Sequence, residues 1–148
     1  MKNFTEKEFP EDLKYAHPKL LKNIDSLRDF MQVPIYPSPV PGALARFDIG
    51  ADTSQHYAVK RLSTALDFFC NADPFEAWTK IIQSGLFPRV GIYFDTFYKN
   101  RKWVMFHGDL KNKGLLWFRH KKKYYYSTYP MFYHKLFKYL FLYRENRK

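Results

Sequence analysis

Apolar residues recur at helical spacing in three parts of the chain. After Pro18 the first stripe is made by Leu20, Leu21, Ile24, Leu27, Phe30 and Met31. This spacing predicts a helix that begins at Pro18 and ends before the prolines of residues 34–41, which force an extended, loop-like passage. Residues 1–17, which precede the helix, have the composition of a polar lead-in.

A second helix is predicted after Asp73, which can cap its N-terminus, with Pro74 at the first helical position. Its apolar stripe comprises Phe75, Trp78, Ile81 and Ile82, and Gly85 ends it. A third helix is predicted over 132–143, after Pro130.

Strand signals occupy most of the remaining sequence. The runs 65–70, 90–94, 103–110 and 115–120 are rich in aromatic and aliphatic residues. Residues 111–114 are predicted to form a hairpin turn between the last two runs, and residues 121–128 to add an edge strand. Residues 43–48 fit either a strand or a loop. The chain is therefore predicted to be a small single α+β domain with an antiparallel sheet and flanking helices.

Charge is distributed very unevenly along the 148 residues, whose formal net charge is +11. Residues 111–148 hold eleven Lys or Arg and one acid, whereas residues 1–110 are nearly neutral. We therefore expect a folded body over residues 1–120 and a basic, aromatic C-terminal extension over residues 121–148. The single cysteine, Cys70, excludes an internal disulfide and multi-cysteine zinc sites.

The C-terminal extension is compatible with three roles. Lys121–Lys123 followed by Tyr124–Tyr126 is typical of single-stranded nucleic-acid binding, where cations contact phosphates and aromatic rings stack on bases. A basic helix with an apolar side also suits an anionic membrane or cell-wall surface. The third reading is that the aromatic residues cover the sheet of the body while Lys and Arg only keep the surface solvated.

Candidate chemistry lies in two short clusters of the body. His56 follows Ser54, and Asp67 is the one charge within the apolar run 65–70. On the run 103–110, alternation places Met105, His107 and Asp109 on one face. A carboxylate on a buried strand is costly unless a cation or hydrogen-bond donors satisfy it, so Asp67 needs a partner. That partner is either a metal ion or an arginine such as Arg46 or Arg61.

The order of these pieces resembles the M15-type zinc peptidases, the D-alanyl-D-alanine carboxypeptidase and phage endolysin-like group, and most of all its short phage-associated branch. The resemblance spans roughly residues 35–119. It rests on Ser38-Pro39, Gly42–Arg46, Ser54-Gln55-His56, Ala65-Leu66-Asp67, Gly91-Ile92-Tyr93, Trp103–Phe106, His107-Gly108-Asp109-Leu110 and Trp117. It implies the small α+β peptidase fold of that group, and as substrate the peptide of bacterial peptidoglycan.

The resemblance also assigns roles to individual residues. His56, Asp67 and His107 would hold a catalytic Zn²⁺, since two imidazoles and a carboxylate leave one coordination position open. Arg46 would grip a peptide carboxylate or backbone oxygen. Ser54 would lie beside the substrate or orient the first ligand.

Two candidates remain for the general base. Asp109 would act as the base or orient a ligand histidine, and Asp95 is the alternative base. The expected activity is zinc-dependent hydrolysis of cell-wall peptides by a phage lysis or entry protein. The alternative is a basic nucleic-acid-binding protein with an inactive peptidase-like body.

Two further expectations concern location and excluded chemistry. The N-terminus has no apolar signal-peptide region, and no apolar run is long enough to cross a bilayer. We therefore expect synthesis in the bacterial cytoplasm and action at the cell wall or within a phage particle. The sequence has no Gly-rich phosphate loop, dinucleotide fingerprint or serine-nucleophile elbow, which argues against nucleotide and acyl-serine chemistry.

Overall fold

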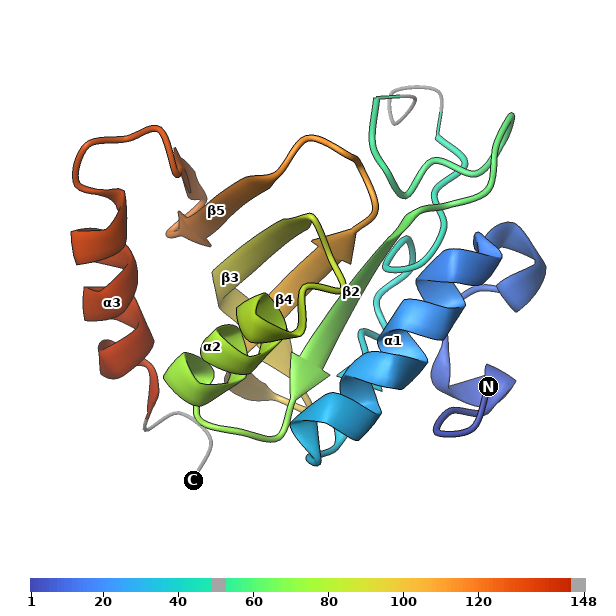
Figure 1. Ribbon diagram of the computed structural model, residues 1–148, viewed down its shortest axis with the longest axis horizontal. Coiled ribbons are helices and arrows are strands. Elements are labelled where there is room, and N and C mark those ends of the chain that lie inside the picture. Colours follow the sequence, from blue (N-terminus) through green and yellow to red (C-terminus); the bar gives the residue numbers. More distant parts are fainter. Residues whose placement is uncertain (49–52, 145–148) are drawn as a thin grey trace.

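The residues that the structure describes form a six-stranded mixed sheet with three α-helices. The computed structural model describes residues 1–48 and 53–144 (Figure 1). The helices are α1 (Pro18–Met31), α2 (Pro74–Ser84) and α3 (Phe132–Leu142), preceded by short 3₁₀ turns at Glu6–Glu8 and Leu13–Tyr15. The strands are β1 (Ile35–Pro37), β2 (Ala65–Cys70), β3 (Arg89–Tyr98), β4 (Arg101–Asp109), β5 (Leu115–His120) and β6 (Lys123–Tyr126).

The strand order is β1-β2-β4-β3-β5-β6, and this order corrects the expected antiparallel sheet. All neighbours are antiparallel except β3 and β5, which are parallel. The predicted hairpin between β4 and β5 is wrong, because the two edges of β4 are taken by β2 and β3. The chain therefore passes the end of β3 and adds β5 at its free edge, in the direction that makes the two strands parallel.

The predicted helices are confirmed, together with the capping of α2. The carboxylate of Asp73 accepts hydrogen bonds from the backbone amides of Phe75 and Glu76, and Gly85 ends α2 with a φ of 64°. Such a left-handed residue favours glycine. α1 begins at Pro18, where the ring of His17 accepts a hydrogen bond from the amide of Lys19.

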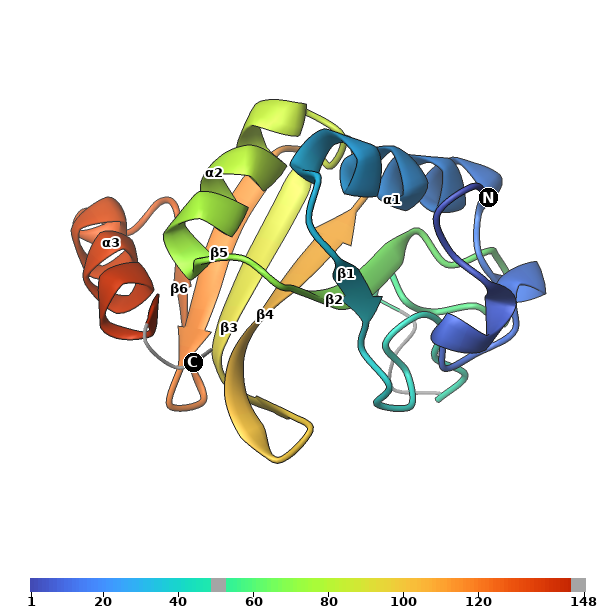
Figure 2. The ribbon, with the colours of Figure 1, turned by 90° about the horizontal axis from the view of Figure 1, so that it is seen from below.

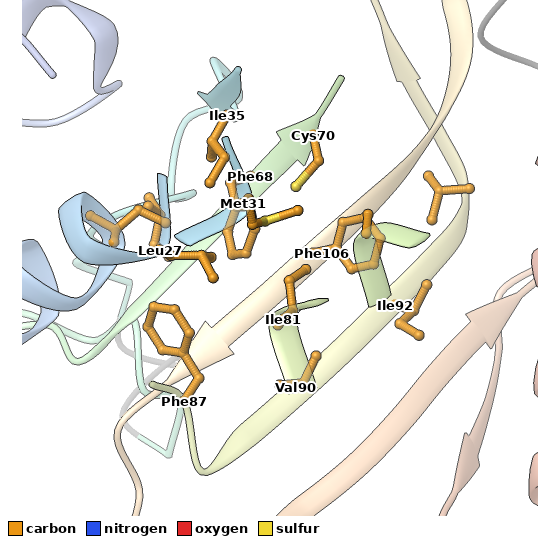
Figure 3. Packing of buried hydrophobic residues seen from close by; sticks show 14 of the residues in the cluster. Leu27, Met31, Ile35, Phe68, Cys70, Ile81, Phe87, Val90, Ile92 and Phe106 are labelled. Atoms are coloured by element: carbon orange, nitrogen blue, oxygen red, sulfur yellow. The ribbon is translucent and has the colours of Figure 1, made fainter. Parts of the chain in front are cut away.

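The helices lie on one face of the sheet, and the other face is left for the site. In Figure 2, α1 and α2 cross above the strands, with α3 beside the β5–β6 end. Between helices and sheet lies the hydrophobic core, in which Leu27 and Met31 of α1 and Ile81 of α2 meet Phe68 and Phe106 (Figure 3). Burial of large apolar side chains of this kind is the main stabilising contribution to a domain of this size.

The N-terminal segment is more than a polar lead-in. Phe4 and Phe9 are buried in the core cluster, and their rings lie 5.7 Å apart. The proline-rich passage is also more ordered than expected, because β1 pairs with β2 at the edge of the sheet. An edge strand tolerates Pro37, whose nitrogen cannot donate a hydrogen bond.

The C-terminal segment packs as part of the same domain. Strand β6 pairs with β5, as the expected edge strand, and α3 buries Phe132, Leu136 and Leu140 in the common core. Residues 121–144, the described part of the expected extension, therefore share a sheet and a core with the body. In the described parts of the chain, no helix combines the length and apolar character needed to span a membrane.

Candidate metal centre

Strands β2 and β4 place Asp67 directly opposite His107. The two residues are paired in the antiparallel register of β2 and β4, so their side chains emerge on the same face. This is the face away from the helices. Met105, His107 and Asp109 line one cavity on this face, as expected from the alternation of side chains along a strand.

His56 reaches the same place from the long connection between β1 and β2. The backbone carbonyl of His56 accepts a hydrogen bond of 2.7 Å from the amide of Arg46, and the amide of Thr64 donates to Gln55 at 2.9 Å. The hydroxyl of Ser54 accepts from the amide of His56 at 3.2 Å. Ser54 therefore contacts the backbone of His56 and also lines the cavity.

Three potential ligand atoms form a small triangle. Nε2 of His56 lies 3.3 Å from Nδ1 of His107 and 3.3 Å from Oδ1 of Asp67. The third side, from Nδ1 of His107 to Oδ1 of Asp67, is 2.9 Å. All three side chains are buried. The carboxylate of Asp67 interacts with the two imidazoles, whereas the sequence left Arg46 or Arg61 as alternative partners. This group could hold a metal ion.

Asp109 lies behind His107. Its Oδ2 is 2.7 Å from Nε2 of His107 and 3.2 Å from Nε of Arg89, and its Oδ1 accepts from the amide of Lys111 at 3.0 Å. The side chain of Asp109 is fully buried. Because an ionised carboxylate only accepts hydrogen bonds, Nε2 of His107 is the donor. The nitrogen Nδ1 of His107 then faces Asp67 and His56, as in carboxylate–histidine–metal arrangements.

The pKa values of His107 and Asp67 are shifted far from their ordinary values. Burial alone would lower the pKa of His107, but hydrogen bonds to Asp109 and Asp67 outweigh it and raise the pKa to about 9. Burial acts to raise the pKa of Asp67, yet the charges and hydrogen bonds of His56 and His107 hold it well below its usual range. The proton on His107 thus sits against the carboxylate of Asp67, and metal binding at this place would release it.

The triangle opens into a cavity of about 510 Å³. Its wall includes the expected residues Arg46 and Ser54, together with Arg89, Tyr93, Trp117, Arg119, Tyr124 and Tyr126. Tyr93 and Trp117 were expected in this region only through the resemblance. The sequence did not predict that Arg89, Arg119, Tyr124 and Tyr126 belong to the site. Alternation along the strands was the available signal, but it indicates a site only once the strand order is known.

The indole of Trp117 covers Gly91 and contacts the ring of His107. The residue opposite both is Gly91 of β3, and a Cβ built there would stand 2.6 Å from Nε1 of the indole. The rings of Trp117 and His107 are 5.0 Å apart, and the guanidinium of Arg89 lies 5.2 Å from the indole. Gly91 therefore leaves the space in which Trp117 supports His107 and Arg89.

Glu11 is a positioning residue that the sequence did not reveal. Its carboxylate accepts hydrogen bonds from the backbone amides of Gly42, Leu44 and Ala45, at 2.8 to 3.1 Å. These amides belong to the loop that carries Arg46. The lead-in segment thus fixes the loop that forms one rim of the cavity.

Asp95, the alternative base, has both carboxylate oxygens engaged and is not among the residues that line the cavity. Oδ1 accepts from Nε of Arg119 and Oδ2 from the amide of Lys122, each at 2.8 Å. Beside the main cavity, a second hollow of about 220 Å³ is lined by apolar groups of Val40, Pro41, Phe69 and Phe97. Arg46, Asp67, Met105 and Arg119 border both cavities.

Comparisons with known proteins give no relative for this chain: no protein-family model, no curated protein and no solved structure matches it.

Proposed function

We propose that this chain is a zinc-dependent peptidase that hydrolyses peptide bonds of bacterial peptidoglycan. The observation that carries the proposal is the convergence of His56, Asp67 and His107 at the edge of an open cavity, with the buried carboxylate of Asp109 behind one of the histidines. The substrate class comes from the resemblance to M15-type peptidases. The geometry contributes the cavity and a His-Asp-His group that could hold a metal ion.

The donor set fits zinc in kind and in spacing. Tetrahedral ligands at about 2.0–2.1 Å from Zn²⁺ lie about 3.3 Å from one another. Two sides of the triangle are 3.3 Å and the third is 2.9 Å, so the side chains need little movement to accept the ion. When bound, zinc would act as a Lewis acid and make a water molecule nucleophilic near neutral pH.

Arg46 and Tyr93 are the groups that would bind the substrate near the triangle. Arg46 lines both cavities, and its Nε donates to the carbonyl of Gly42 at 3.3 Å, which leaves the end of the guanidinium for a carboxylate or carbonyl oxygen. Burial raises the pKa of Tyr93 above its usual range. Its hydroxyl therefore stays protonated and can donate a hydrogen bond to the oxygen on which charge develops.

The proton of the attacking water needs an acceptor. Asp67 and Asp109 are the acidic side chains among the described residues that line the cavity. Asp109 already accepts from His107 and Lys111 and pairs with Arg89, so we assign it first to holding His107 in the ligating orientation. The substitution Asp109→Asn separates the two roles: a purely orienting residue loses activity that excess zinc restores, whereas a proton acceptor loses activity that zinc does not restore.

The test combines metal content with hydrolysis. We expect about one zinc ion per chain by mass spectrometry, retained in the control His134→Ala, whose side chain is exposed, and lost in His56→Ala and His107→Ala. Wild-type protein and the control should release peptide fragments from purified peptidoglycan, and the two site variants should not. Full hydrolysis by folded His56→Ala, or a wild type that takes up no zinc, would refute the proposal.

A further inference from the structure

A single row of residues connects the candidate metal centre to the far edge of the sheet. The strand registers align Asp67 with His107, His107 with Gly91, Gly91 with Trp117, and Trp117 with Tyr126. A second row runs from Met105 through Tyr93 and Arg119 to Tyr124. All of these side chains except that of Gly91, which has none, line the cavity of about 510 Å³. The cavity thus extends from β2 to the C-terminal edge strand.

Tyr124 and Tyr126 are two exposed aromatic residues at the end of these rows, here called the aromatic platform. They are two residues apart on β6, so they share a face. Their rings are nearly parallel, at 13°, with centroids 6.4 Å apart. They are 45% and 46% exposed, whereas the intervening Tyr125 points to the other face and stacks on Phe118. The rings of the platform are therefore exposed and stay outside the hydrophobic core.

Two arginines of the cavity wall near the platform are paired with carboxylates. Arg119, which lies between Tyr93 and Tyr124, is paired with Asp95 at 2.8 Å, and Arg89 is paired with Asp109. The same cavity contains the carboxylate of Asp67. A nucleic-acid groove needs several cations available to phosphates. A neutral ring with an apolar face, such as a sugar, can stack on an exposed aromatic ring and needs no unpaired cation.

We propose that Tyr124 and Tyr126 are a sugar-binding subsite, which holds a ring of the glycan strand while the attached peptide lies along the rows toward His107. This inference rests on the proposed function, because the substrate it specifies is a glycan-linked peptide. Three strand spacings separate β6 from β4, which is about 14 Å. An extended peptide covers that distance with about four residues. Cleavage is therefore expected about four residues from the sugar.

The experiment compares two substrates that differ only in the sugar: a disaccharide–peptide fragment of peptidoglycan and the same peptide without the disaccharide. Tyr124→Ala, Tyr126→Ala and the double variant are measured beside Tyr133→Ala, an equally exposed tyrosine on α3. We expect KM for the disaccharide–peptide to rise about tenfold in the platform variants, the change that about 1.4 kcal/mol of contact produces. KM for the free peptide should rise much less than KM for the disaccharide–peptide, and Tyr133→Ala should match the wild type with both substrates.

Binding measurements separate failure of the subsite from failure of the peptidase. The metal-site variant His56→Ala should still bind the disaccharide–peptide, and adding Tyr124→Ala and Tyr126→Ala should weaken that binding about tenfold. If no substrate is cleaved but this loss is seen, the sugar subsite stands and the peptidase proposal fails. Equal effects on both substrates, or none, would overturn the subsite alone. Tyrosine-dependent binding of a single-stranded oligonucleotide without sugar binding would also overturn it.

Discussion

Gly91 offers the sharpest test of how the site is built. In Gly91→Ala the new methyl group would stand 2.6 Å from Nε1 of Trp117, whereas ordinary contact begins near 3.4 Å. Trp117 is 5% exposed and is held between His107 and Arg89, so the indole has little room to withdraw. We therefore expect Gly91→Ala to destabilise the protein and to weaken zinc binding at the same time.

Two opposing effects set the change in the free energy of unfolding. Overpacking a buried site costs about 1–3 kcal/mol. Replacing glycine by alanine at an unstrained position stabilises by about 0.4–1 kcal/mol through the unfolded chain. Gly114→Ala is the matched control, because its nearest contact would be the carbonyl of Pro88 at 3.6 Å. The two variants should differ by about 1–3 kcal/mol, which corresponds to roughly 2–12 °C in Tm for a chain of this length.

The assay is thermal denaturation of wild type, Gly91→Ala, Gly114→Ala, Trp117→Leu and the double variant Gly91→Ala/Trp117→Leu. Once the indole is gone, the added methyl group has nothing to displace, so the double variant should be no less stable than Trp117→Leu alone. If Gly91→Ala matches Gly114→Ala in stability, or if its cost persists without the indole, the role assigned to Gly91 is wrong.

Three further outcomes are expected. Asp109→Asn should reduce zinc affinity by about 10–100-fold in a chelator competition, because His107 loses the carboxylate that orients it, while the fold persists. In the metal-free protein the pKa of His107 is raised from 6.5 to about 9, so this proton stabilises the folded state fully below pH 6.5 and its contribution is lost as the pH rises through 9. Urea denaturation from pH 6 to 10 should show a loss of at most about 3 kcal/mol, absent in His107→Ala. Glu11→Gln should lower the free energy of unfolding by about 1–3 kcal/mol in the same assay. It should also raise KM, because the loop that carries Arg46 is held less firmly, while the zinc content stays unchanged. Unchanged stability and KM would show that the amides of residues 42–45 do not need this carboxylate.

The sequence by itself determined the local elements and the identity of the candidate ligands. The spacing of apolar residues predicts helices α1 and α2, and Pro18, Asp73 and Gly85 mark their ends. This is possible because helix formation and capping depend on residues within a few positions. Alternation likewise indicated which residues of 103–110 share a face, and the isolated charge of Asp67 indicated that it needs a partner.

Only the tertiary structure decided which of these faces meet. The strand order, the parallel pairing of β3 with β5 and the placement of β6 beside the site depend on which sheet edges remain free, and no local pattern encodes that. The register that puts Asp67 opposite His107, and the loop that brings His56 within 3.3 Å of both, join residues up to 51 positions apart. Glu11 and Trp117 acquired their roles in the same way. Contacts between distant residues are selected by the packing of the whole core and by loop closure, so they exist only in the folded chain.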